Sequence, residues 1–181
     1  MLNLKKQFPS GGNRMKITDK YVFFWGGEFS NFYPCTIVDD EFTFNCSEQI
    51  YMYVKAKMFN DDKTAEKIYA ATDPKEQKKL GRSVQGFKQK KWDIHKEWVM
   101  FHAVYKKFDQ NPELKELLLS TRNHVIVEAS PYDSIWGIGI GGVDNPAIED
   151  PANWKGQNLL GEVIMRVRRA MEIIELMKEV K

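Results

Sequence analysis

The chain has 181 residues, of which 43% are apolar and 29% are charged, a balance typical of a globular domain that excludes a disordered chain. Its 27 basic and 25 acidic side chains leave a net charge of +2, too small for a protein that mainly coats DNA or RNA. No apolar run reaches the roughly 18 residues of a membrane-spanning helix, and the N-terminal stretch lacks the apolar core of a signal peptide. We therefore expect one domain with no membrane partner.

The predicted elements begin after a loose leader, because Pro9 and the Ser-Gly-Gly-Asn run behind it discourage regular structure. We place this leader at residues 1–17 and the domain at residues 18–181. Tyr21 to Trp25 is a β-rich run that Gly26 and Gly27 stop. A short hairpin is predicted at residues 36–38 and 42–44, around an Asp-Asp-Glu turn.

Helices dominate the rest of the chain. Ser47 is predicted to cap a helix to residue 59, and a second helix fits residues 63–71. Asp73 and Pro74 begin a third helix that stops near Gly81. A further helix is predicted at residues 92–108, with Ile94 and Trp98 among the apolar positions near one face. Helices are also predicted at 112–119 and 158–180, with a strand at 124–129 between these two. The sequence thus predicts an α+β fold, mostly helical, in a single domain with a few short strands.

Cysteine and histidine are too few and too scattered to indicate a metal centre. Cys35 and Cys46 do not suffice for a disulfide framework or a Cys-rich zinc site, and we expect free thiols in a reducing cytoplasm. His95, His102 and His124 have no carboxylate or third histidine that completes a ligand set. We therefore expect no metal, no cofactor and a cytoplasmic location.

Two charges on the helix at residues 47–59 could carry chemistry. Glu48 and Lys55 are seven residues apart, which places them within about 20° of each other on one helix face. Most of the remaining positions are apolar or aromatic. A lysine in a low-dielectric wall can lose its proton and attack an electrophilic carbon, while a carboxylate moves the proton. The spacing alone favours an ordinary helix whose two charges reach solvent.

Residues 75–91 form a basic segment with seven positive side chains against the single acid Glu76. The positive side chains are Lys75, Lys78, Lys79, Arg82, Lys88, Lys90 and Lys91. Such a cluster is compatible with a solvated face, with the phosphate of a small substrate or with nucleic acid. Trp92 follows directly and is either a core residue or a plane on which a base stacks.

A long irregular segment, residues 130–156, is rich in Gly, Pro, Asp and Trp. Long stretches without regular structure inside a domain are usually functional or disordered, and the aromatic and aliphatic residues here argue against disorder. The glycines from Gly137 to Gly142 do not match the dinucleotide fingerprint, and no clear helix follows them. A tight loop that lets a substrate approach the backbone and a purely structural loop both remain open.

Six sequence blocks follow one another over about residues 21–175. The blocks are Phe24-Trp25 with Phe29 to Phe32; Cys46 to Gln49 with Lys55-Ala56; Leu80-Gly81-Arg82 with Trp92; Lys107-Phe108 with Leu114 and Leu118; Val127 to Ser130 with Asp133 and Trp136-Gly137; and Gly156 to Gly161 with Met165 and Arg168. Taken together and in this order, the blocks resemble the NADAR family. This sequence departs from the family pattern at Ile50, where members commonly carry an aromatic residue.

The resemblance implies an N-glycosidase that hydrolyses the bond between ribose and a base. Two substrate classes follow from it: ribosylaminopyrimidine phosphates of riboflavin synthesis, and ADP-ribose attached to guanine in nucleic acid. It assigns catalytic roles to Lys55, Glu48 and Asp133. It also implies that Trp92, Trp136, Gly137, Arg82, Asn31 and Phe32 contact the substrate, although Arg82 is also compatible with a salt bridge and Asn31-Phe32 with a turn and a core ring.

We expect Lys55 to attack C1 of ribose as a neutral amine and form a Schiff base that water hydrolyses, with Glu48 moving protons. A non-catalytic module that binds ADP-ribose or a nucleotide is the alternative from another class. The expected partners are a small phosphorylated ribosyl substrate or ADP-ribosylated nucleic acid, with no obligate protein partner.

Overall fold

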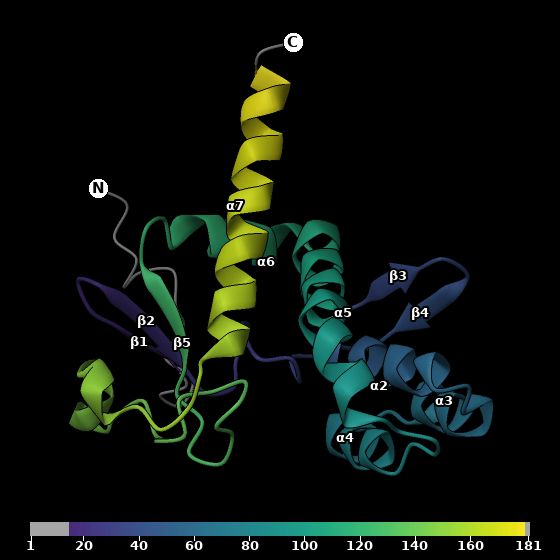
Figure 1. The fold of residues 1–181 in the computed structure, drawn as a ribbon. Helices are drawn as coiled ribbons and strands as arrows, with labels where there is room; N and C mark the ends of the chain where they lie inside the picture. Colours follow the sequence, from purple (N-terminus) through teal and green to yellow (C-terminus); the bar gives the residue numbers. More distant parts are fainter. Residues whose placement is uncertain (1–14, 180–181) are drawn as a thin grey trace. The chain divides into compact units, whose positions relative to one another are not determined.

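A computed structural model describes residues 15–179, and the chain divides into two compact units. Unit 1 consists of Met1–Ser30 and Pro112–Lys181, and unit 2 of Asn31–Asn111. The described residues contain six α-helices, five short strands and two 3-10 turns, which confirms the predicted α+β class (Figure 1). The single domain over residues 18–181 stays a prediction, and each unit is described by itself.

Unit 1 is built on a three-stranded sheet in the order β1-β2-β5. Strand β1 (Met15–Ile17) runs antiparallel to β2 (Tyr21–Phe24), and β2 runs parallel to β5 (Val125–Glu128), with Val22 opposite Ile126. The predicted leader is therefore three residues too long, because Met15–Ile17 pairs with β2. Its residues 1–14 lie outside the described part of the chain.

Helix α7 (Leu159–Glu179) packs closely on β5, and α6 (Pro112–Ser120) contacts α7 (Figure 1). Asn158 fastens the start of α7 to the strand: its Nδ2 donates to Ile126 O at 2.9 Å and its Oδ1 accepts from Glu128 N at 3.0 Å. A Cβ on Gly161 would lie 2.1 Å from Ile126 O, so only glycine permits this approach. These contacts fix the carboxyl end of β5 in unit 1.

The irregular segment between β5 and α7 is held by a core of its own, and the prediction of an irregular stretch is confirmed. It contains only two short 3-10 turns, η1 (Pro146–Glu149) and η2 (Pro151–Asn153), among its described residues. Its side chains Ile138, Val143 and Ile148 are buried in a cluster with Phe23, Val127 and Ala129. The long loop is therefore packed structure.

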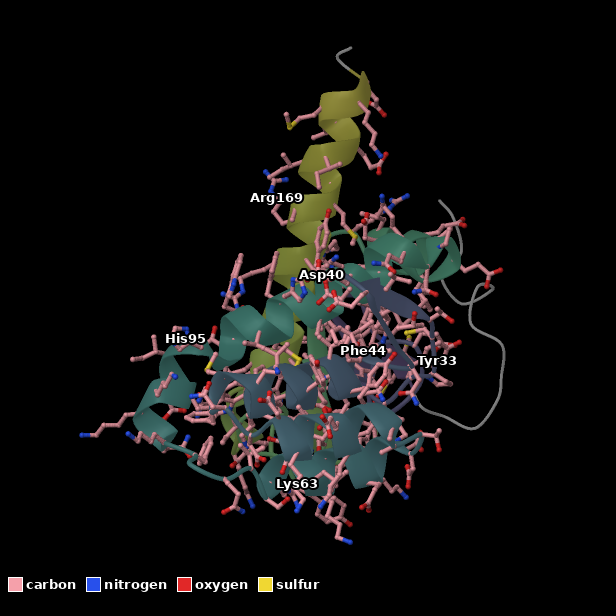
Figure 2. All side chains as sticks on the ribbon, turned by 90° about the vertical axis from the view of Figure 1, so that its right-hand side faces the viewer. Tyr33, Asp40, Phe44, Lys63, His95 and Arg169 are labelled. Carbon is pink, nitrogen blue, oxygen red and sulfur yellow. The ribbon has the colours of Figure 1, made fainter. Side chains whose placement is uncertain are left out.

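Unit 2 contains four helices and a hairpin: α2 (Ser47–Met58), α3 (Asp62–Ala70), α4 (Pro74–Arg82), α5 (Gln89–Gln110), β3 (Ile37–Asp39) and β4 (Phe42–Phe44). Helix α2 contacts each of the other three helices (Figure 1). Phe44 is buried in a cluster with Ile37, Ile50 and Ala103, whereas Lys63 on α3 and His95 on α5 are exposed (Figure 2). The helix that carries Glu48 and Lys55 is thus the centre of this unit.

Three local predictions in unit 2 need correction. Ser47 is the first residue of α2 and not its cap; the N-cap is Cys46, which makes no side-chain cap bond. Gly81 does not stop α4, which continues through Arg82. The apolar positions Ile94 and Trp98 of α5 are 77% and 69% exposed, because the helix buries a different face.

Residues 15–179 include no helix with an apolar stretch long enough for a bilayer.

Close packing of α4 on α2 depends on Gly81. A Cβ on Gly81 would lie 2.1 Å from Met52 Sδ and 2.8 Å from Met52 Cγ, so α4 approaches α2 only because this residue has no side chain. Overpacking a filled interface costs about 1–3 kcal/mol. An alanine inside a helix normally gains about 1 kcal/mol over glycine, which partly offsets that cost.

We predict that Gly81→Ala lowers the free energy of unfolding by about 1 kcal/mol net, measured by urea denaturation. Lys79→Ala, on the exposed side of the same helix, is the matched control and should change stability by less than about 0.5 kcal/mol. A Gly81→Ala protein as stable as the parent would show that α2 and α4 pack less tightly than described.

Candidate active site

Buried amide side chains fix the start of α2, where Glu48 lies. Gln49 Nε2 donates to Ile68 O, Tyr69 O and Ala71 O at 2.9–3.1 Å, and Gln49 Oε1 accepts from Asn45 N at 2.8 Å. The backbone N of Glu48 donates to Asn31 O at 3.0 Å. Glu48 itself is only 3% exposed. Its carboxyl group is therefore held in a desolvated place at the first turn of a helix, where the helix dipole favours the ionised form and burial the neutral one.

Lys55, two turns further along α2, is half-buried under polar and aromatic groups. Its Nζ donates to Gly81 O at 2.8 Å. The same Nζ lies 4.3 Å from the ring centroid of Phe87 and 5.7 Å from that of Trp92. A backbone carbonyl can accept a hydrogen from either the charged or the neutral amine, so this bond orients the nitrogen without fixing its protonation state.

Burial lowers the pKa of the Lys55 amine, and the positive charge of Arg82 lowers it further, whereas the negative charge of Glu48 raises it. A lowered pKa increases the fraction of neutral amine at physiological pH, and the neutral amine is the nucleophile. The carboxyl group of Glu48 on the same helix is available to exchange protons with a reacting group. This pair can therefore carry covalent chemistry at an electrophilic carbon.

Trp92 lies beside this amine as a buried wall. Its side chain is 6% exposed, and its ring is 5.1 Å from the ring of Tyr51. A ring buried to this degree agrees with the core position that the sequence left open for Trp92. Its contact with a substrate stays a prediction.

The other predicted residues of unit 2 lie at different depths. Arg82 ends α4 and is exposed, where it can meet an anion. Asn31 is buried and donates from Nδ2 to Met100 Sδ at 3.2 Å, while its Oδ1 has no hydrogen-bond partner among the described residues. Phe32 is half-buried, with Lys78 Nζ 5.7 Å from its ring. Unit 2 therefore brings together Glu48, Lys55, Arg82 and Trp92, with the backbone of Asn31 bound to that of Glu48.

Asp133, Trp136 and Gly137 belong to unit 1, in the loop after β5. Asp133 Oδ1 accepts from Ile135 N at 3.0 Å and from Trp136 N at 2.8 Å, so this carboxylate shapes the loop. A Cβ on Gly137 would lie 3.0 Å from both Glu128 O and Asp133 O, so glycine is needed for close packing there. Trp136 is half-buried. Contacts of these three residues with a substrate stay a prediction.

Sequence reasoning missed two groups that contact Lys55. Gly81 was interpreted only as a helix stop, although it lies in a block between Leu80 and Arg82. Phe87 is the single aromatic residue of the basic segment, which was interpreted only through its positive side chains. The positive φ of 67° at Gly86 turns the chain just before it, and Asp61 Oδ2 accepts from Gln85 N at 2.8 Å to anchor this loop. The Gly86-Phe87 pair between two predicted helices is the only sequence signal that could have indicated the contact of Phe87 with Lys55.

Cysteine chemistry finds no support in this unit. Burial raises the pKa of the Cys46 thiol to about 12, and the thiol donates to Gln77 Oε1 at 3.2 Å. Burial also raises the pKa of Cys35. Both cysteines are free thiols, as predicted, and both are poor nucleophiles.

The comparison with protein families decides the relationship of this chain. The NADAR domain family matches residues 23–172, which include Glu48, Lys55 and the loop after β5. This chain belongs to the NADAR family. The resemblance seen in the six sequence blocks is thereby confirmed.

Relatives and a solved structure agree with this assignment. The N-glycosidase R617 of Acanthamoeba polyphaga mimivirus is 40% identical over 165 residues, which cover 83% of this chain and 96% of that protein. Protein irg-1 of Caenorhabditis elegans is 38% identical over 172 residues, which cover 85% of this chain and 81% of irg-1. The NMR structure of Escherichia coli YbiA matches with a TM-score of 0.72 at 31% identity, covering 91% and 92% of the two chains. YbiA is itself named an N-glycosidase.

Substitution of Arg82 tests how its positive charge affects the pKa of Lys55. Because the positive charge of Arg82 lowers the pKa of Lys55, Arg82→Gln should raise that pKa. Labelling of Lys55 by acetic anhydride rises with pH as the amine loses its proton. We predict that the midpoint of this rise, followed by peptide mass spectrometry without substrate, moves to higher pH in Arg82→Gln.

Lys79→Gln removes an exposed positive charge from the same helix and is the matched control, with an expected midpoint equal to that of the parent. A midpoint unchanged in Arg82→Gln, or moved equally by both variants, would contradict the specific influence of Arg82.

Proposed function

We propose that this chain is an N-glycosidase, a hydrolase that cleaves the bond between C1 of ribose and the nitrogen of a base, with Lys55 as the nucleophile. The observation that carries the proposal is the half-buried Lys55 amine, whose charged form is disfavoured by burial, on the same helix as the buried carboxyl group of Glu48. The family and the relatives named N-glycosidases support the reaction class.

The proposed substrate is a ribosylaminopyrimidine phosphate of riboflavin synthesis, and the proposed compartment is the cytoplasm. A ribosylamine opens its ring readily, which turns C1 into an imine-like electrophile. The exposed guanidinium of Arg82 supports this choice, because it is suited to hold the phosphate. No cofactor or obligate protein partner enters the proposed reaction.

The reaction proceeds in two stages. In the first, Lys55 Nζ bonds to C1 of the ring-opened ribosylamine, Glu48 supplies a proton to the leaving nitrogen, and the C1–N bond to the base breaks. A Schiff base between Lys55 and the open-chain sugar remains. In the second stage water adds to C1 with proton transfer through Glu48, the C1–Nζ bond breaks, and free ribose phosphate leaves. The net change is hydrolysis of one N-glycosidic bond.

A second candidate function is removal of ADP-ribose from guanine in nucleic acid. The observation that favours it is the exposure of the basic segment: Lys75, Lys79, Arg82, Lys88, Lys90 and Lys91 are all exposed. Exposed cations attract the phosphates of nucleic acid and of the diphosphate itself. The same Lys55 and Glu48 would act on the ribose of ADP-ribose.

We predict that sodium borohydride, which reduces a Schiff base, traps a sugar adduct on Lys55 that intact-protein and peptide mass spectrometry detect. Ribosylaminopyrimidine phosphate is offered in one arm and an oligonucleotide with ADP-ribosylated guanine in the other. An added ribose phosphate supports the first substrate, and an added ADP-ribose supports the second. Lys55→Ala should form no adduct and lose turnover, with a circular dichroism spectrum like that of the parent.

Lys57→Ala is the matched control, because Lys57 lies on the same helix but is exposed and pairs with Asp62. It should keep both the adduct and the turnover. Product without any adduct would contradict the covalent route in favour of direct attack by water. Neither adduct nor product in either arm would leave a non-catalytic nucleotide-binding module as the better reading.

Glu48→Gln keeps the shape of the side chain and removes its exchangeable proton, so kcat should fall about 10²–10⁴-fold. Glu66→Gln, an exposed substitution on α3, serves as the control and should leave kcat unchanged. A loss smaller than about tenfold in Glu48→Gln would remove Glu48 from the proton transfers.

A further inference from the structure

Two aromatic side chains form an exposed patch in unit 1 that the proposed chemistry does not use. The rings of Trp25 and Tyr132 lie 6.2 Å apart, tilted by 60°. Trp25 is 45% exposed and Tyr132 is 89% exposed, and Ile135 in the same loop as Tyr132 is 42% exposed. Large apolar groups that gather in water usually mark a binding surface.

The patch lies where two parallel strands end. Trp25 directly follows β2, and Tyr132 is in the loop that follows β5. The two strand ends are joined beyond the ladder by the bond from Ala129 N to Phe24 O at 2.8 Å. Loops at the carboxyl ends of parallel strands are the usual place for ligands in open sheets. The patch therefore occupies a favourable position within its own unit.

Hydrogen bonds hold the backbone of the loop that carries Tyr132. Besides the two bonds that Asp133 Oδ1 accepts, the loop carbonyls of Ile135 and Trp136 accept from the first residues of α7, Leu159 N at 3.2 Å and Leu160 N at 3.0 Å. On the other side, Gly26 and Gly27 both have positive φ, 91° and 67°, which turns the chain away immediately after Trp25. The backbone that carries Tyr132 is therefore held in place, which lowers the cost of ordering it when a ligand binds.

We propose that Trp25 and Tyr132 form a stacking platform for a planar heteroaromatic base. The choice of a base as the ligand rests on the proposed function, because an N-glycosidic substrate always carries one. Every base has a π-face that can stack on an aromatic side chain, and both side chains are exposed. Because the two rings are tilted by 60°, one of them stacks on the base and the other contacts it with its edge. Truncating one stacking ring typically weakens binding by about 5- to 100-fold.

The test uses the full chain with GMP, and ribose 5-phosphate as the ligand without a base. GMP should shift the indole N–H signal of Trp25 in ¹⁵N NMR spectra, whereas ribose 5-phosphate should not. Trp25→Ala and Tyr132→Ala should each weaken GMP binding by about 5- to 100-fold, and Tyr132→Phe should restore it. Trp98→Ala, which removes an exposed tryptophan of α5, is the matched control and should bind GMP like the parent.

A short single-stranded oligonucleotide forms a further arm, and tighter binding than GMP would identify nucleic acid as the source of the base. An equal response to ribose 5-phosphate, no shift of Trp25, or an equal loss in Trp98→Ala would each overturn the platform. The outcome is separable from the proposed function: Lys55→Ala should still bind GMP, whereas the proposed function is tested by the borohydride adduct on Lys55 and not by GMP binding.

Discussion

The hydrogen bond from Lys55 Nζ to Gly81 O is the contact on which the candidate site of unit 2 depends. It forms where α4 lies so close to α2 that a Cβ at position 81 would force the side chain of Met52 to move. The same close approach carries Arg82, the next residue, near enough for its charge to act on the pKa of the amine. One missing side chain thus positions the Lys55 amine and brings beside it a positive charge that lowers its pKa.

Burying the Lys55 amine lowers the free energy of unfolding, and hydrogen bonds near the same helices offset this cost. Burial holds the pKa of Lys55 below its usual range, so the unfolded chain binds the proton more tightly than the folded one. The resulting cost is present below the folded pKa and disappears as pH rises towards the unfolded value. Hydrogen bonds of two amide side chains offset such a cost. Gln49 of α2 donates to Ile68 O and Ala71 O, and Gln77 of α4 donates to Ala71 O.

Local patterns predicted the elements of the fold well, because helices and short strands follow from periodicity and caps. Asp73 and Pro74 illustrate this: the carboxylate accepts from Lys75 N, and the proline takes the first helical position, as predicted. The Glu48 and Lys55 spacing likewise indicated one helix face. Contacts distant in sequence could not be derived in this way. The residues next to Gly81 in the sequence do not indicate that it packs against Met52. The residues next to Phe87 likewise do not indicate that its ring lies beside the Lys55 amine.

Burial of aromatic residues was the hardest property to predict, and it changes how their roles are assigned. Trp92 and Trp25 are both tryptophans beside sequence blocks of the family, yet one is 6% exposed and the other 45% exposed. A buried ring excludes water and so favours a neutral amine, whereas an exposed ring can stack on a ligand. Trp92 therefore forms a buried wall beside Lys55, and stacking on a base is proposed only for the exposed rings on the loops of unit 1.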